Sequence, residues 1–402
     1  MQRLVVAVAL VACRGDHEDA GRQRPASAVS AVVPKLPQSD DGAAELRAID
    51  KRIEIHRDDP HQELPMLLER ATYRGHLEDY QEALARSAAW VAAAPTDVDA
   101  WVQRVRALTA VHKFAEARVA LDSLRPLATD PNEVEQLATT IDEATGQLDR
   151  SAKVREADAR RFPNPMSLTR WAQSLALTGE LDHAIALIPR AAATIHDNTP
   201  ELLSWLLFAW GRLYEQKAEP AAARQLFEAA RARMPAIEPT THLAQAMIAT
   251  GDAAGAKRLV EAALVDNRHP ELLALAAQLD PRPERVAAAR AEWERYLAAL
   301  PEAFGDHAAR FYLAAGANPA RALELADGNL ANRDTREARA LVVEAALAAD
   351  KPDRACAVVE PLVATAATHA QRFLAWRALA RCGRATEADR LAGELGITGP
   401  TR

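Results

Sequence analysis

The sequence predicts an all-α protein, built as an α-solenoid of about ten helical hairpins. Apolar residues make up 49% of the 402 residues but aromatic residues only 5%, a composition typical of closely packed helices rich in alanine and leucine. A small residue also recurs along the chain at a nearly constant spacing, and turn and proline signals recur in step with it. Together these observations predict stacked helix pairs with little or no β-strand.

The recurring small residue marks the second helix of each predicted hairpin. Successive members are 33 or 34 residues apart, except for one step of 39 residues: Ala83, Ala117, Ser151, Ala184, Ala223, Ala256, Ala289, Ala322, Ala355 and Ala388. A hairpin of this length cannot bury its own apolar face, so a small side chain lets its two helices approach and the next hairpin covers the remainder. The array is predicted over residues 64–396, with an insertion around residues 195–200 in the long step.

Turn and closing signals support the same register. Polar or glycine-containing turns precede the small residue, as in TGELDH before Ala184 and TGDAAG before Ala256. Prolines close several units, at Pro95, Pro163, Pro235, Pro270 and Pro301. Residues 43–63 are expected to form an N-terminal capping helix, and residues 397–402 a disordered tail.

One unit carries a family pattern. The stretch WGRLYEQKAEPAAARQLFEAARARMP resembles the tetratricopeptide repeat (TPR) at its small, aromatic and closing-proline positions, namely Trp210, Gly211, Tyr214, Ala223, Phe227, Ala230 and Pro235. The resemblance implies that the hairpins stack into a right-handed superhelix whose concave groove binds ligands. It is specific for the fold and says little about function, because this fold has many partners.

The N-terminus predicts export. Arg3, the apolar run 4–12 and the small residue Ala12 precede Cys13, which is the layout of a short signal peptide. Residues 10–13, LVAC, resemble the lipobox of bacterial lipoproteins, whose cysteine is acylated. The resemblance implies a signal peptide over residues 1–12 and lipidation of Cys13. The alternative is a short apolar leader followed by an ordinary buried cysteine.

The predicted lipid would be the only membrane attachment. Two or more acyl chains anchor a protein stably, and no other apolar run is long enough to span a bilayer. Residues 13–42 are rich in proline, serine, glycine and charge, which predicts a disordered tether. Arg14 occupies the position where an aspartate usually signals inner-membrane retention in enteric lipoproteins, so we expect the periplasmic side of the outer membrane.

No stretch of the sequence predicts catalysis or a cofactor. The net charge of −7 lacks the positive field that nucleic-acid binding requires. There is no H-E-x-x-H or G-x-S-x-G motif, and GDAAGAK at 251–257 has the wrong spacing for a phosphate loop. His56 and His61 flank two aspartates, but a solvated turn explains them better than a metal site. We therefore expect a non-enzyme without cofactor or metal.

The expected ligand surface is the concave groove. Positions that face away from the packing seam carry arginine, amide and aromatic groups, which are common at binding surfaces: Gln103, Arg106, Arg170, Gln173, Phe208, Arg212, His242, Gln245, His307 and Phe311. An ordinary solvated helix face remains the alternative. The asparagine and lysine pattern of the TPR carboxylate clamp is absent.

These features predict an envelope-anchored, non-catalytic TPR scaffold that binds a protein or peptide. A carrier of an extended peptide, glycan or lipid segment in the groove is the alternative, and an enzyme with an unrecognised site is less favoured.

Two further cysteines lie near the C-terminus. Cys356 is placed early in the second helix of the ninth unit, and Cys382 ends the first helix of the tenth. These elements are adjacent and antiparallel in a stacked array, so their ends can meet. A disulfide in an oxidising compartment and two buried free thiols are both compatible with this placement.

Overall fold

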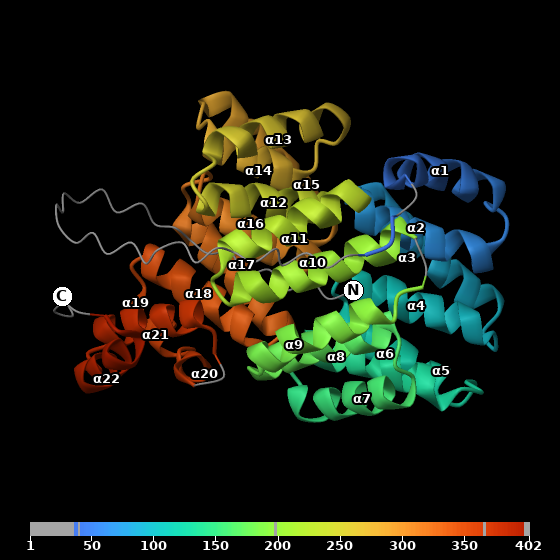
Figure 1. The fold of residues 1–402 in the computed structure, drawn as a ribbon, viewed down its shortest axis with the longest axis horizontal. Helices are drawn as coiled ribbons and strands as arrows, with labels where there is room; N and C mark the ends of the chain where they lie inside the picture. The colour runs from blue at the N-terminus through green and yellow to red at the C-terminus, as the bar shows by residue number, and fades with distance from the viewer. Residues whose placement is uncertain (1–35, 39–40, 197–198, 365–366, 398–402) are drawn as a thin grey trace.

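The computed structural model describes residues 36–38, 41–196, 199–364 and 367–397, and within these ranges it contains 22 helices and no strand. A capping helix, α1 (Gly42–Ile55), precedes ten consecutive hairpins (Figure 1). The first five are α2 (Pro60–Arg74) with α3 (Leu77–Ala93), α4 (Val98–Ala110) with α5 (Phe114–Leu124), α6 (Pro131–Ala144) with α7 (Leu148–Arg161), α8 (Pro165–Thr178) with α9 (Leu181–Ala193), and α10 (Pro200–Gln216) with α11 (Pro220–Arg233).

The remaining five hairpins continue the array to α22. They are α12 (Ile237–Ala249) with α13 (Ala253–Asp266), α14 (Pro270–Leu279) with α15 (Pro283–Ala299), α16 (Pro301–Leu313) with α17 (Pro319–Asn332), α18 (Arg336–Ala348) with α19 (Pro352–Cys356) and α20 (Glu360–Val363), and α21 (His369–Arg381) with α22 (Ala385–Leu395). The predicted all-α solenoid of TPR-like hairpins is confirmed.

The small residues found in the sequence lie where the two helices of each hairpin approach. All ten of them, from Ala83 to Ala388, are at most 1% exposed. A larger side chain at any of these points would meet a closely packed neighbour. The sequence periodicity therefore identified the correct register of the repeat.

Local signals begin and end the helices. Proline occupies the first turn of α2, α6, α8, α10 and several later helices, where its missing N–H costs nothing. Asp97 caps α4 by accepting hydrogen bonds from the backbone N–H groups of Asp99 and Ala100, which have no intrahelical partner. Each hairpin is therefore bounded by its own sequence.

The ninth hairpin departs from the pattern because its second helix is divided into the short helices α19 and α20. Pro361 has no backbone N–H to continue a helix from α19. A disulfide joins Cys356, at the end of α19, to Cys382, directly after α21, with 6.0 Å between the two Cα atoms. The covalent link connects this interrupted hairpin to the last one.

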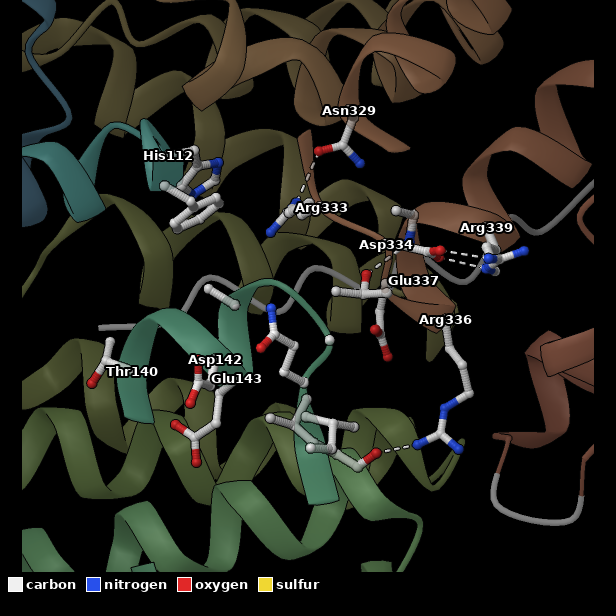
Figure 2. A pocket seen from close by; sticks show the side chains of 18 of the residues that line it. His112, Thr140, Asp142, Glu143, Asn329, Arg333, Asp334, Arg336, Glu337 and Arg339 are labelled. Carbon is white, nitrogen blue, oxygen red and sulfur yellow. Dashed lines mark hydrogen bonds and ion pairs between the residues drawn. The ribbon is translucent and has the colours of Figure 1, made fainter. Parts of the chain in front are cut away.

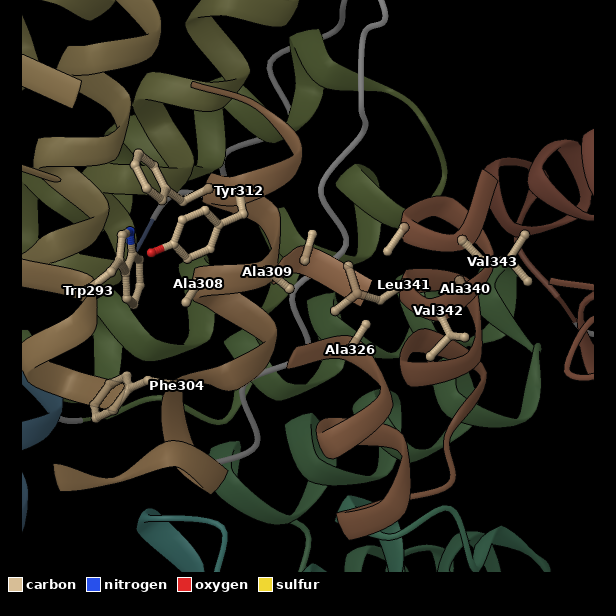
Figure 3. Packing of buried hydrophobic residues seen from close by; sticks show 14 of the residues in the cluster. Trp293, Phe304, Ala308, Ala309, Tyr312, Ala326, Ala340, Leu341, Val342 and Val343 are labelled. Atoms are coloured by element: carbon tan, nitrogen blue, oxygen red, sulfur yellow. The ribbon is translucent and has the colours of Figure 1, made fainter. Parts of the chain in front are cut away.

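The superhelix returns upon itself, so that early and late hairpins touch. The largest apolar cluster contains Tyr80 of α3 together with Trp293, Phe304 and many residues of the last four hairpins (Figure 3). Helix α2 also packs against α12. The array is thus a closed turn rather than an open arc.

Hydrogen bonds between distant loops fix this closure. The side chain of Asn267 donates to the carbonyl of Arg74 (2.7 Å), and the hydroxyl of Tyr296 donates to the carbonyl of Gly75 (2.9 Å). The next turn along repeats the arrangement, since Asn332 donates to the carbonyl of His112 (2.9 Å). Backbone carbonyls of the early hairpin turns are therefore satisfied by side chains about six hairpins later.

The N-terminal side of the array is also covered. Leu36 packs against the apolar cluster of α8, α9 and α10, and Arg233 donates a hydrogen bond to the carbonyl of Pro37 (2.5 Å). The last residues of the segment predicted as a tether thus lie against the array. Cys13, the rest of that segment and most of the predicted tail lie outside the described residues. Among the described helices, none is both long and apolar enough to cross a bilayer.

The TPR-like pattern of the fifth hairpin has a steric basis. A Cβ added to Gly211 in α10 would lie 2.5 Å from the ring of Phe227 in α11, and Phe227 is fully buried. We predict that Gly211→Ala lowers the free energy of unfolding by about 1–3 kcal/mol, because overpacking forces the ring to move.

Gly328→Ala in α17 is the matched control, since its added Cβ meets nothing within 4 Å. Alanine has the higher helix propensity, so this variant should gain up to about 1 kcal/mol. Urea unfolding followed by circular dichroism measures both. Equal effects of the two substitutions would contradict the close approach.

Candidate functional site

A cleft of about 1110 Å³ lies between the early and late hairpins (Figure 2). One wall is formed by α6, the start of α7 and the C-terminal ends of α4 and α8. The opposite wall is formed by α16, α17, α18 and the segment around α20. The cleft therefore exists only because the superhelix closes.

The cleft is lined by charges of both signs. Seven arginines and six carboxylates contribute to its surface, and several form ion pairs within one wall, such as Arg118 with Asp142 (2.9 Å) and Arg339 with Asp334 (2.5 Å). Arg336 of α18 crosses the cleft and donates to the carbonyl of Leu177 at the end of α8. The surface is polar and close to neutral, and one side chain ties its two walls together.

His112 holds the seam at one side of the cleft. Its backbone is left-handed (φ 59°), which histidine adopts more readily than most residues but at some cost. Its ring stacks on Phe114 (5.3 Å between centroids), and Nδ1 lies 3.1 Å from the carbonyl oxygen of Glu302. A carbonyl only accepts, so Nδ1 carries the hydrogen. These inter-turn contacts offset the unusual backbone.

Asp306 supplies a fixed negative charge on the opposite wall. It is 3% exposed and forms an ion pair with Arg333 (2.5 Å). Burial opposes its ionisation, but the charges of His307 and Arg333 outweigh burial and hold the pKa of Asp306 well below its usual range. The carboxylate is therefore ionised at neutral pH.

A buried ion pair supports the α6 wall from behind. The guanidinium of Arg155 in α7 meets the carboxylate of Glu143 through two hydrogen bonds of 2.9 and 3.2 Å, and it also donates to Thr140 (3.0 Å) and to Gln136. Arg155 is only 3% exposed. Thr140 and Glu143 both line the cleft, so Arg155 fixes their positions from the hairpin interior.

The predicted groove residues divide into two groups. The expectation that they are exposed is wrong for five of them, each at most 7% exposed: Gln103, Arg212, His242, His307 and Phe311. The inner faces of neighbouring hairpins pack together here. Arg212 pairs with Glu215 (2.6 Å) and Glu215 contacts His242 (3.1 Å). This group stabilises the array.

The other five remain accessible to different degrees. Arg106 and Arg170 are exposed, and Gln173, Phe208 and Gln245 are half-buried. None of the ten predicted residues lines the cleft. Sequence reasoning missed the cleft because no residue pattern encodes how many hairpins complete one superhelical turn. The only signal was the repeated glycine turns, of which Gly146 contributes to the cleft.

The residues considered as metal ligands do not converge. Within the described ranges, no group of three histidine, cysteine, aspartate or glutamate side chains is placed to hold a metal ion. His61 instead lies edge-on to Trp90 (4.4 Å between centroids) and contacts Asp99 (3.1 Å). Its place at the first hairpin is explained by packing.

Comparisons with known proteins bear on the fold alone. No protein-family model matches the chain, and no curated protein matches it. Among solved structures, it is similar to the APC/C hetero-tetramer Cut9-Hcn1 (10% identity, 89% of this chain and 67% of that one, TM-score 0.49).

Two further solved structures show more distant similarity. A tetratricopeptide repeat protein from Parabacteroides merdae ATCC 43184 is 16% identical over 66% of this chain and 98% of its own (TM-score 0.38). Naa15/Naa10 bound to HypK-THB is 12% identical over 88% of this chain and 68% of that one (TM-score 0.32). At such low identities these similarities do not extend beyond helical-repeat architecture.

The Arg155–Glu143 pair generates a stability prediction. Arg155→Ala should lower the free energy of unfolding by about 3–5 kcal/mol, because it leaves a buried carboxylate without its partner. The double variant Arg155→Met, Glu143→Met should recover most of this loss, since no uncompensated charge remains.

Arg160→Ala in the same helix is the control. Arg160 pairs with Glu156 (2.6 Å) but is exposed, so its loss should cost no more than about 1 kcal/mol. Urea unfolding of the four proteins measures the differences. A cost for Arg155→Ala no greater than that for Arg160→Ala would contradict a structural role for the pair.

Proposed function

We propose that this protein is a non-catalytic scaffold that binds an extended segment of a protein partner in the cleft between its early and late hairpins. The observation that carries this proposal is the cleft itself. Its volume of about 1110 Å³ exceeds the range of roughly 300–1,000 Å³ found for small-molecule pockets. Its two charged walls offer both donors and acceptors along an elongated surface.

The chemistry of the lining favours a polypeptide over a lipid chain. A peptide presents amide donors, carbonyl acceptors and side chains of either charge, and each has complementary groups in the cleft. An acyl chain would leave the arginines and carboxylates of the walls without water and without new partners, which is costly. The mixed lining therefore supports the protein-binding scaffold against the lipid carrier.

Envelope anchoring through Cys13 is part of the proposal. It rests on the resemblance of residues 10–13 to a lipobox. Leu36 and Pro37 lie against α8 to α11, so an acylated Cys13 would connect to the array through residues 14–35. The array would then be held near a membrane with its cleft available to partners.

Photo-crosslinking from both walls tests the binding site. Asp149 and Ala364 line opposite walls of the cleft and are exposed, so a photoreactive amino acid at each position should capture the same partner in native envelopes. Val265 on α13 is 82% exposed and lies outside the cleft, which makes it the control position.

The outcome separates the candidate functions. Capture of one polypeptide from positions 149 and 364, identified by mass spectrometry, and its absence at position 265 is the expected result. Capture of a lipid or glycan at the two cleft positions would favour the carrier function. Partner capture from position 265 alone would place binding on another face and overturn the proposal.

The anchor has its own test. Cys13→Ala should release the protein from the membrane fraction, because no acyl chain remains to hold it. Inhibition of lipoprotein signal cleavage should leave a slower-migrating precursor. Immunoblotting of membrane and supernatant fractions measures both. Membrane association that survives Cys13→Ala would contradict lipid anchoring.

A further inference from the structure

Two inner-face arginines lie on the continuation of the cleft wall. On α4, Arg106 precedes the cleft residue Thr109 by three positions. On α8, Arg170 precedes the cleft residue Leu177 by seven. Residues three, four or seven apart share one face of a helix. Arg106 and Arg170 therefore extend the same face beyond the mouth of the cleft.

The positive charge of these two arginines is weakly compensated. Arg170 makes no hydrogen bond or ion pair with the described residues, although its side chain is exposed and free to reach one. Arg106 has a single long contact to Glu133 (3.5 Å). By contrast, Arg155 beside them is neutralised by Glu143 (2.9 Å). The inner face of α4, α6 and α8 thus carries excess positive charge.

The surroundings of Arg170 make this charge costly without a ligand. Arg170 reaches solvent but is flanked by protein on the inner side of the superhelix, and this burial lowers its pKa. The charge of Arg155 lowers it further and Arg106 adds to this, while Glu143 and Asp158 oppose the shift. An anion placed between Arg106 and Arg170 would relieve the repulsion.

An unsatisfied acceptor lies on the same face. Gln103, one turn before Arg106 on α4, is 7% exposed, and its side-chain oxygen has no hydrogen-bond partner among the described residues. A buried acceptor without a partner is costly, and a backbone N–H of a bound chain would satisfy it. A peptide with carboxylate side chains supplies this donor and the anion together.

Resting on the proposed scaffold function, we propose that the partner segment is acidic, and that Arg106 and Arg170 bind its carboxylates where it leaves the cleft. The whole chain carries a net charge of −7, so long-range attraction does not bring an acidic peptide to it. Binding of such a peptide must then come from local cations. Guanidinium groups suit this role because they pair with carboxylates through two hydrogen bonds.

Peptide binding to the purified full-length protein tests the proposal. The probes are a fluorescent ten-residue peptide of alternating glutamate and alanine, its lysine and alanine counterpart, and phosphatidylglycerol vesicles. Anisotropy titration should give a Kd for the acidic peptide at least tenfold lower than for the basic one. Arg170→Glu and Arg106→Glu should each weaken acidic-peptide binding at least tenfold.

Arg190→Glu is the matched control. Arg190 is exposed on α9, the second helix of the hairpin that contains Arg170, and makes no ion pair with the described residues. It changes the net charge equally, so it should weaken binding less than twofold. Circular dichroism and Tm establish that each variant is folded, and Arg170→Gln replaces Arg170→Glu if the latter is not.

Several results would overturn the acidic-segment proposal. They are equal affinity for both peptides, no binding of the acidic peptide, an equal loss in Arg190→Glu, or Arg170-dependent binding to the vesicles and not to the peptide. Crosslinking from positions 149 and 364 is independent of these titrations. If a partner is captured there equally well by Arg170→Glu, the scaffold function stands and the acidic specificity falls.

Discussion

The architecture depends on contacts between hairpin turns and the loops that lie about six hairpins further along the chain. In an ordinary solenoid each repeat touches only its neighbours, and stability is a sum of local terms. Here the carbonyls of Arg74, Gly75 and His112 accept hydrogen bonds from Asn267, Tyr296 and Asn332. The two turns of the superhelix become one cooperative body, and the cleft is the space that remains between them.

The same closure determines which charged groups are structural and which are accessible. Where inner faces meet tightly, Arg212, Glu215 and His242 satisfy one another. Where the walls separate, Arg118 and Asp142 pair on one side and Arg339 and Asp334 on the other. Arg106 and Arg170 lie beyond both regions, and their charge remains largely uncompensated by protein. Chemically similar residues at equivalent repeat positions therefore have different roles.

The sequence predicted the repeat register because that register depends on short-range packing. Ala83 and its nine equivalents lie at the close approach in every hairpin. The meeting of Cys356 and Cys382 also follows from the adjacency of neighbouring units. The cleft and the burial of Arg212 and His307 were not predictable. They depend on small rotations between hairpins that accumulate over six units, and each rotation is set by many contacts at once.

Closure also constrains the length of the protein. In an open array, a unit can be gained or lost with only local consequences. Here the turn at Gly75 must meet His269 and Tyr296, since a Cβ on Gly75 would already lie 2.5 Å from the His269 ring. Deleting one 33-residue unit between them would shift every pairing of turn and loop by one hairpin. Repeat number is thus a geometric property of the fold, as strand number is in a closed barrel.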